Sequence, residues 1–188
     1  EPRTYLWHLT YDEIKKYDVG QRQHPSYPEQ VTMPAVRPLL SDVLTFTENY
    51  AKEKGLAPLK YNIEIKADPD YDGGIEGDDW PYFDDFVNIC VSVLDSFNLG
   101  DRLIVQSFDE RALSYMHIKY PHLILSYLVG GGEVEWLEND EMDFDRIIGK
   151  IGFYPSGGIV FCLYLHENFA GHTCPLPLTV DKALLLQC

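Results

Sequence analysis

The chain has 188 residues, of which 45% are hydrophobic and 13% aromatic, which is enough for one packed core and argues against disorder. Its 30 acidic and 15 basic residues give a formal net charge of −15, and such a surface repels nucleic acid and anionic membranes but does not exclude a small anionic substrate. No segment approaches the roughly 20 apolar residues that a membrane span needs, so we expect no transmembrane segment. From its length, we expect the chain to form a single domain over residues 1–188.

The cysteines and the chain start say little about the compartment. The four cysteines form no C-x-x-C pair, so a zinc site is not expected, and free buried thiols or a disulfide both remain open. The chain begins at Glu1 without a methionine or a signal peptide, which is typical of a processed chain or a fragment.

The first half of the chain alternates between helical and extended patterns. Thr10 to Glu13 reads as a capping box that opens a short helix ending near Gly20. The proline-rich segment 21–37 predicts a loop, and the apolar spacing over 39–54 predicts a helix closed by Gly55. Residues 61–66 then alternate as a strand.

The same alternation continues to the end of the chain. The sequence predicts helices over 81–97, 110–120 and 141–150, and strands over 103–108, 123–129, 151–154 and 175–180. Strands that recur at about the ~30 residues of a βαβ unit predict an α/β fold with a parallel sheet. With five strands, the sheet is either doubly wound and open or an incomplete (β/α)₈ barrel, which typically needs about 250 residues.

The strand Tyr61–Lys66 carries Asn62, Glu64 and Lys66 on one face. In a barrel that face points inward, and the carboxyl end of the strand is the catalytic end. Glu64 could there bind a hard cation, and Lys66 could meet phosphate charge. An internal salt bridge on an exposed strand face explains the same residues equally well.

The next predicted strand ends in Gln106, Ser107, Phe108 and Asp109. A polar turn at this end of a strand suits a loop that contacts a ligand. However, Ser107 or Asp109 capping the following helix is the simpler interpretation.

Several motifs in the same order resemble the glycerophosphodiester phosphodiesterase family. Asn62–Lys66 is similar to the family's N-(I/L)-E-(I/L)-K strand, and Ile104–Asp109 to its (V/I)-x-Q-S-F-D motif. Leu9–Gly20 resembles L-T-x-x-E-(L/I)-x-x-x-D-x-G, and Pro38–Val43 resembles P-T-L-x-E-V. Leu178–Asp181 is similar to W-T-V-N, with leucine in place of tryptophan. The resemblance covers roughly residues 5 to 155.

The resemblance implies a TIM-type (β/α)₈ barrel that hydrolyses glycerophosphodiesters to glycerol 3-phosphate and an alcohol with Mg²⁺ or Ca²⁺. It implies that Glu64 is a catalytic residue and metal ligand, and that Lys66 is a catalytic residue that stabilises charge on the phosphoryl oxygens. It also implies that Gln106 and Phe108 bind the substrate. The metal would polarise the phosphoryl oxygen and lower the pKa of the attacking group.

The family's first two strands and its last strand have no counterpart in this sequence, and so the barrel is expected to be incomplete. Those first strands carry the family's catalytic histidines and a Glu-x-Asp pair. We assign none of the six histidines here as a base, and a chain with one carboxylate and one lysine is expected to be close to inactive.

Residues 68–79 follow the D-x-D-x-D-G spacing of a Ca²⁺ loop, with Asp79 at the twelfth position. Because a strand precedes this segment and Pro69 interrupts it, a solvated acidic loop is the favoured interpretation. The alternative to an enzyme is a non-catalytic binding module on a degraded barrel, which retains a ligand pocket or a Ca²⁺-stabilised acidic loop. A different barrel hydrolase that shares only the strand motifs is a third hypothesis. The head group, the native metal, the oligomeric state and the compartment stay open, with a slight preference for a periplasmic or secreted protein.

Overall fold

The computed structural model describes residues 5–67, 81–130, 137–138, 141–142, 148–149, 151–162 and 184–187. Its helical elements are η1 (Leu6–His8), α1 (Tyr11–Ile14), α2 (Leu40–Glu53), α3 (Phe83–Ser96), η3 (Gly100–Arg102) and α4 (Glu110–Lys119). Its strands are β1 (Tyr61–Glu64), β2 (Leu103–Ser107), β3 (Ile124–Gly130), β4 (Leu137–Glu138), β5 (Glu141–Met142), β6 (Ile159–Cys162) and β7 (Leu184–Gln187).

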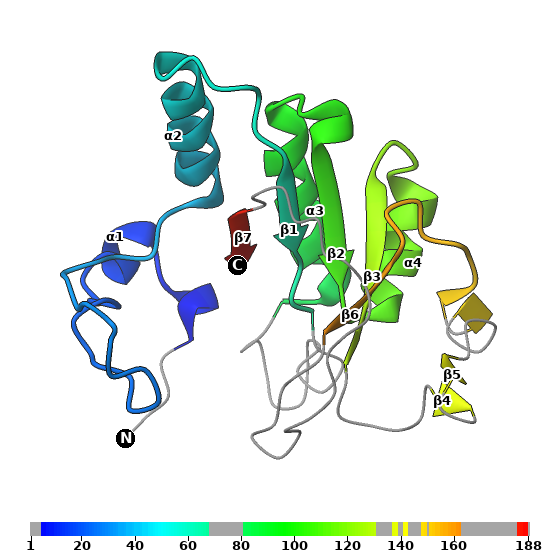
Figure 1. Ribbon diagram of the computed structural model, residues 1–188, viewed down its shortest axis with the longest axis horizontal. Coiled ribbons are helices and arrows are strands. Elements are labelled where there is room, and N and C mark those ends of the chain that lie inside the picture. Colours follow the sequence, from blue (N-terminus) through cyan, green and yellow to red (C-terminus); the bar gives the residue numbers. More distant parts are fainter. Residues whose placement is uncertain are drawn as a thin grey trace.

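Five of these strands form one parallel sheet in the order β6-β3-β2-β1-β7. Figure 1 shows α3 and α4 together on one face of this sheet. Consecutive parallel strands joined through a helix are the βαβ units that the spacing predicted. The carboxyl ends of β1, β2 and β3 therefore lie at the same edge of the sheet, opposite the edge where these strands begin.

The hydrophobic core lies between the sheet and these two helices. Ile63, Val105 and Leu125 lie side by side on neighbouring strands and are at most 2% exposed. The helices contribute buried side chains to the same cluster: Val87, Val91, Leu94, Leu113 and Met116. Burying each such side chain stabilises the fold by roughly 1.5–3 kcal/mol, so this face of the strands is fixed and the opposite face is left for other contacts.

The predicted capping box at α1 is confirmed, but the helix ends earlier than the predicted Gly20. Glu13 accepts a hydrogen bond from the Thr10 amide at 2.8 Å, and Thr10 Oγ1 accepts one from the Glu13 amide. The Asp18 carboxylate then accepts from the amides of Gly20, at 3.0 Å, and Ala35, at 3.1 Å. Asp18 thus closes the loop that follows, because its hydrogen bonds favour a turn over further helix.

The helix α2 is tied to the sheet by one polar cluster. Arg102 donates to both carboxylate oxygens of Glu48, at 2.7 and 3.0 Å, and to the Leu59 carbonyl at 2.8 Å. The Tyr61 hydroxyl donates to Glu48 at 2.6 Å. The guanidinium hydrogen bonds lower the pKa of the Glu48 carboxyl, because they favour its ionised form. The two-pronged geometry gives this pair a fixed orientation.

Most predicted elements up to residue 130 are confirmed within about two residues, whereas the later ones are partly wrong. The predicted helix over 141–150 is wrong at its start, because Glu141–Met142 form strand β5, which pairs antiparallel with β4. The predicted strand over 151–154 is also wrong, since Gly152 has a φ of 77° and breaks the extended backbone. The strand lies instead at β6, and the predicted strand over 175–180 falls outside the described residues.

Among the described helices, none is long and apolar enough to cross a membrane. The assignment of residues 1–188 to a single domain stays a prediction.

Candidate functional site

The candidate site lies on the face of β1 that points away from α3 and α4. Glu64 is 8% exposed although it is a carboxylate, and Lys66 is largely exposed. Lys66 Nζ lies 4.0 Å from Glu64 Oε1. The ion pair required by the salt-bridge interpretation is therefore present, but it is long, and the face around Glu64 is buried. Within the described residues Glu64 has this one distant cation, so its carboxylate retains electron pairs for another ligand.

A pair of amides crosses from β1 to β2 on the same face. Gln106 is in register with Glu64 and is 4% exposed. Asn62 Nδ2 donates to Gln106 Oε1 at 2.9 Å. Asn62 Oδ1 is buried, and within the described part of the chain it has no hydrogen-bond partner. Because an unpaired buried oxygen is costly, this position suits a water molecule or a ligand that supplies a donor or a positive charge.

The turn after β2 caps helix α4, through one of the two residues that the sequence suggested for this role. Asp109 caps α4, as the simpler interpretation predicted: its Oδ1 accepts from the Arg111 amide at 2.9 Å. The Asp109 side chain is fully buried and its Oδ2 lies 2.7 Å from Arg111 Nη2. Ser107, by contrast, does not cap the helix but donates to the Ile65 carbonyl at 2.7 Å.

The first residue of α4, Glu110, contacts β3. The Tyr127 hydroxyl donates to Glu110 Oε2 at 3.1 Å. Burial raises the pKa of the Tyr127 phenol, and the nearby Glu110 charge raises it further. Tyr127 lies on the helix-covered face of the sheet with Leu125, so its phenol does not enter the candidate site on the opposite face.

Glu64, Lys66, Gln106 and Phe108 all lie at the carboxyl edge of two adjacent strands, as predicted. Phe108 is 37% exposed and stands at the rim. Asn62 joins the candidate site through its bond to Gln106, and its place on the Glu64 face was the sequence signal that could have identified it.

The oxygen atoms at this edge fit part of a site for a hard divalent cation. The Glu64 carboxylate and the unpaired Asn62 Oδ1 lie two residues apart on one strand face, and Mg²⁺ and Ca²⁺ prefer such ligands. Within the described residues, no group of three His, Cys, Asp or Glu could hold a metal ion. These residues alone therefore supply one carboxylate, and the acidic segment 68–79 lies outside the described residues.

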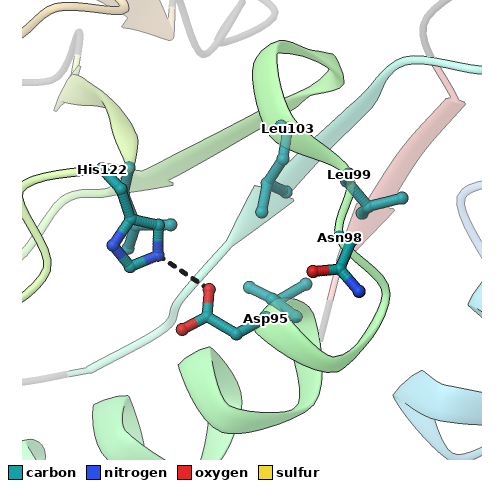
Figure 2. Close-up of a pocket in the computed structure, with 8 residues that line it drawn as sticks. Asp95, Asn98, Leu99, Leu103 and His122 are labelled. Carbon is teal, nitrogen blue, oxygen red and sulfur yellow. Dashed lines mark hydrogen bonds and ion pairs between the residues drawn. The ribbon is translucent and has the colours of Figure 1, made fainter.

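A cavity of about 370 Å³ lies at the opposite edge of the sheet, where β2 begins. Figure 2 shows His122 pointing toward Asp95 beside Leu99 and Leu103, and His122 Nε2 lies 2.8 Å from Asp95 Oδ1. Since the polar ends of β1 and β2 are at the other edge, this cavity is separate from the candidate site.

Comparison with known proteins decides the family. The model of the glycerophosphoryl diester phosphodiesterase family matches residues 2–150. The chain belongs to this family. Its fold is a TIM barrel, and the described α/β arrangement with its parallel sheet is part of one, which confirms the predicted fold class. No curated protein matches the sequence.

Two solved structures are similar to the chain. A candidate glycerophosphoryl diester phosphodiesterase from Silicibacter pomeroyi DSS-3 is 23% identical, with a TM-score of 0.56, over 78% of this chain and 48% of its own. A candidate glycerophosphodiester phosphodiesterase from Galdieria sulphuraria is 18% identical, with a TM-score of 0.46, over 81% of this chain and 47% of its own. The chain spans about half the length of each, and the first likeness supports the fold alone.

Proposed function

We propose that the protein hydrolyses glycerophosphodiesters to glycerol 3-phosphate and an alcohol with the help of a divalent cation. The observation that carries this proposal is the buried Glu64 carboxylate beside Lys66 at the carboxyl edge of β1, in a chain of the glycerophosphoryl diester phosphodiesterase family. Parallel barrels place their reacting groups at this edge.

Glu64 and Asn62 Oδ1 would hold the cation, Mg²⁺ or Ca²⁺, together with ligands from other parts of the protein. When bound, the cation would polarise a phosphoryl oxygen and lower the pKa of the attacking hydroxyl or water. The burial of Glu64 strengthens this role, because the attraction between opposite charges grows as water is excluded.

Lys66 would stabilise negative charge on the phosphoryl oxygens. Its ammonium is exposed and lies 4.0 Å from Glu64, so it can turn toward a bound phosphate without leaving a short ion pair. The Gln106 oxygen is engaged by Asn62, which leaves the amide nitrogen as the end that can donate to substrate. Phe108 would pack against the apolar part of the substrate from the rim.

The described histidines do not supply an acid and a base here. Between ring centroids, His117 stacks on Phe153 at 3.9 Å, His24 contacts Tyr27 at 4.9 Å, and His8 lies edge-on to Tyr5 at 6.2 Å. His122 pairs with Asp95 at the opposite edge. The proton transfers of the proposed reaction therefore depend on groups outside the described residues.

The test is cleavage of glycerophosphocholine by the whole native protein, before and after removal of metal with EDTA. We expect release of choline that stops with EDTA and returns with Mg²⁺ or Ca²⁺. Lys66→Met should lower kcat/KM by roughly 10²–10³-fold, the typical cost of losing one charge-stabilising group. Lys60→Met, which removes an exposed lysine before β1, is the matched control. Metal binding without any cleavage would contradict the proposal and favour a non-catalytic binding module.

A further inference from the structure

Just beyond the end of β1, the Ser107 side chain binds the backbone where the backbone hydrogen bonds between β1 and β2 stop. The Ile65 amide donates to the Gln106 carbonyl at 2.8 Å, and among the described residues this is the last backbone bond between the two segments. The next β1 carbonyl, that of Ile65, accepts from the Ser107 hydroxyl at 2.7 Å. Ser107 is completely buried, so this bond is shielded from competing water.

The same hydroxyl has a second partner on the following turn. Ser107 Oγ accepts from the Asp109 amide at 3.0 Å, and so it donates to one backbone group and accepts from another. Asp109 in turn caps α4 and lies 2.7 Å from the Arg111 guanidinium. Through Ser107, the carboxyl end of β1 is thus coupled to the amino end of α4.

The carbonyl that Ser107 holds is that of the peptide bond between Ile65 and Lys66, directly before Lys66 in the chain. Rotation of this peptide would turn Lys66 relative to Glu64, because Glu64 precedes Ile65 in the chain and Lys66 follows it. A fixed Ile65 carbonyl therefore sets the direction in which the Lys66 side chain leaves the strand beside Glu64, while the exposed ammonium can still turn at its tip.

We propose that Ser107 is a positioning residue that sets the placement of Lys66 relative to Glu64 for the reaction. This inference rests on the proposed function. Ser107 shares its strand face with Val105, opposite Gln106, so it acts through the backbone without touching substrate. Groups that orient a ligand from behind typically contribute ten- to a hundredfold to metal affinity or activity.

The experiment compares Ser107→Ala with Ser114→Ala in the whole native protein. Ser114 is a fair control, because its hydroxyl also donates to a backbone carbonyl, that of Ile151 at 3.0 Å, but it lies within α4 and, among the described residues, has no bond to β1. For Ser107→Ala we expect kcat for glycerophosphocholine to fall about ten- to a hundredfold with KM nearly unchanged, and half-saturating Mg²⁺ to rise. Hydrogen exchange at the Asp109 amide should also quicken. Ser107→Cys, which keeps the volume with a weaker donor, should change each quantity in the same direction.

Three results would overturn the inference. Wild-type kcat and metal dependence in Ser107→Ala would show that the hydroxyl positions nothing. An equal loss in Ser114→Ala would reduce the effect to general destabilisation. Absence of cleavage by the unmutated protein would remove the proposed function, and the inference with it. That last failure is recognised in the wild type, before any variant is compared.

Discussion

Asn62 donates a hydrogen bond to Oε1 of Gln106 across 2.9 Å, and this bond joins β1 to β2 on the face that carries Glu64. The bond gives Gln106 a defined orientation, since its oxygen faces Asn62 and its nitrogen is turned elsewhere. It also leaves Asn62 Oδ1 as a buried acceptor next along the strand to Glu64.

At saturating Mg²⁺ or Ca²⁺, which offsets the loss of the Asn62 oxygen as a metal ligand, replacing Asn62 should weaken substrate binding more than catalysis. In Asn62→Ala, Gln106 loses the partner that fixes its rotamer, and ordering such a side chain costs roughly 0.5–1.5 kcal/mol. We expect KM for glycerophosphocholine to rise by about three- to tenfold, with a smaller change in kcat, measured by steady-state kinetics. Asn98→Ala, an exposed asparagine at the opposite edge of the sheet, should leave KM unchanged. An unaltered KM in Asn62→Ala would show that the amide pair does not prepare Gln106.

The pair formed by Glu48 and Arg102 should make stability depend on acid. Because the pKa of Glu48 is lowered from its ordinary 4.5, the pair stabilises the fold fully above that value and loses this effect as pH falls through the lower, folded-state pKa. At about pH 6, Glu48→Gln should lower the free energy of unfolding by about 1 kcal/mol. This difference should shrink toward about pH 3, as measured by urea unfolding. A difference that grows on acidification would contradict the assigned direction.

The loop closed by Asp18 should not tolerate a side chain at Gly20. A Cβ at Gly20 would lie 2.7 Å from Ala35 Cβ and even closer to the Met33 carbonyl, so the backbone would have to move. We expect Gly20→Ala to open the loop that the backbone bond between Val19 and Ala35 closes, and to speed cleavage of this loop in limited proteolysis. Gly149→Ala is the control, because no atom of the described residues lies within 4 Å of its Cβ position. Equal cleavage of the two variants would mean that the close approach does not hold the loop.

The sequence was most informative where a local pattern determines local structure. The capping box at Thr10 and the alternation in β1 both reappear in the structure, since each depends on residues a few positions apart. The missed strand β7 carries the short apolar run Leu184–Leu186, which alone does not distinguish strand from helix. It is a strand because it pairs with β1, more than a hundred residues earlier in the chain.

The site shows the same division between local and distant contacts. Glu64 and Lys66 could be proposed because they sit two residues apart in one motif. The bond from Asn62 to Gln106 spans 44 positions, and that from Ser107 to Ile65 spans 42. Such cross-strand contacts follow from the register of the sheet, which the sequence alone does not specify.

The central claim is that Glu64 is a ligand of the divalent cation, and calorimetric titration of the whole native protein with Mg²⁺ or Ca²⁺ tests it most directly. Glu64→Gln keeps the size of the buried side chain and removes its charge, whereas Glu53→Gln makes the same change at an exposed position at the end of α2. We expect Glu53→Gln to bind the cation like the wild type. Glu64→Gln should lose roughly a hundredfold or more in affinity, because losing the contact between the carboxylate charge and the cation costs about 3 kcal/mol. Binding by Glu64→Gln with wild-type affinity would contradict the account.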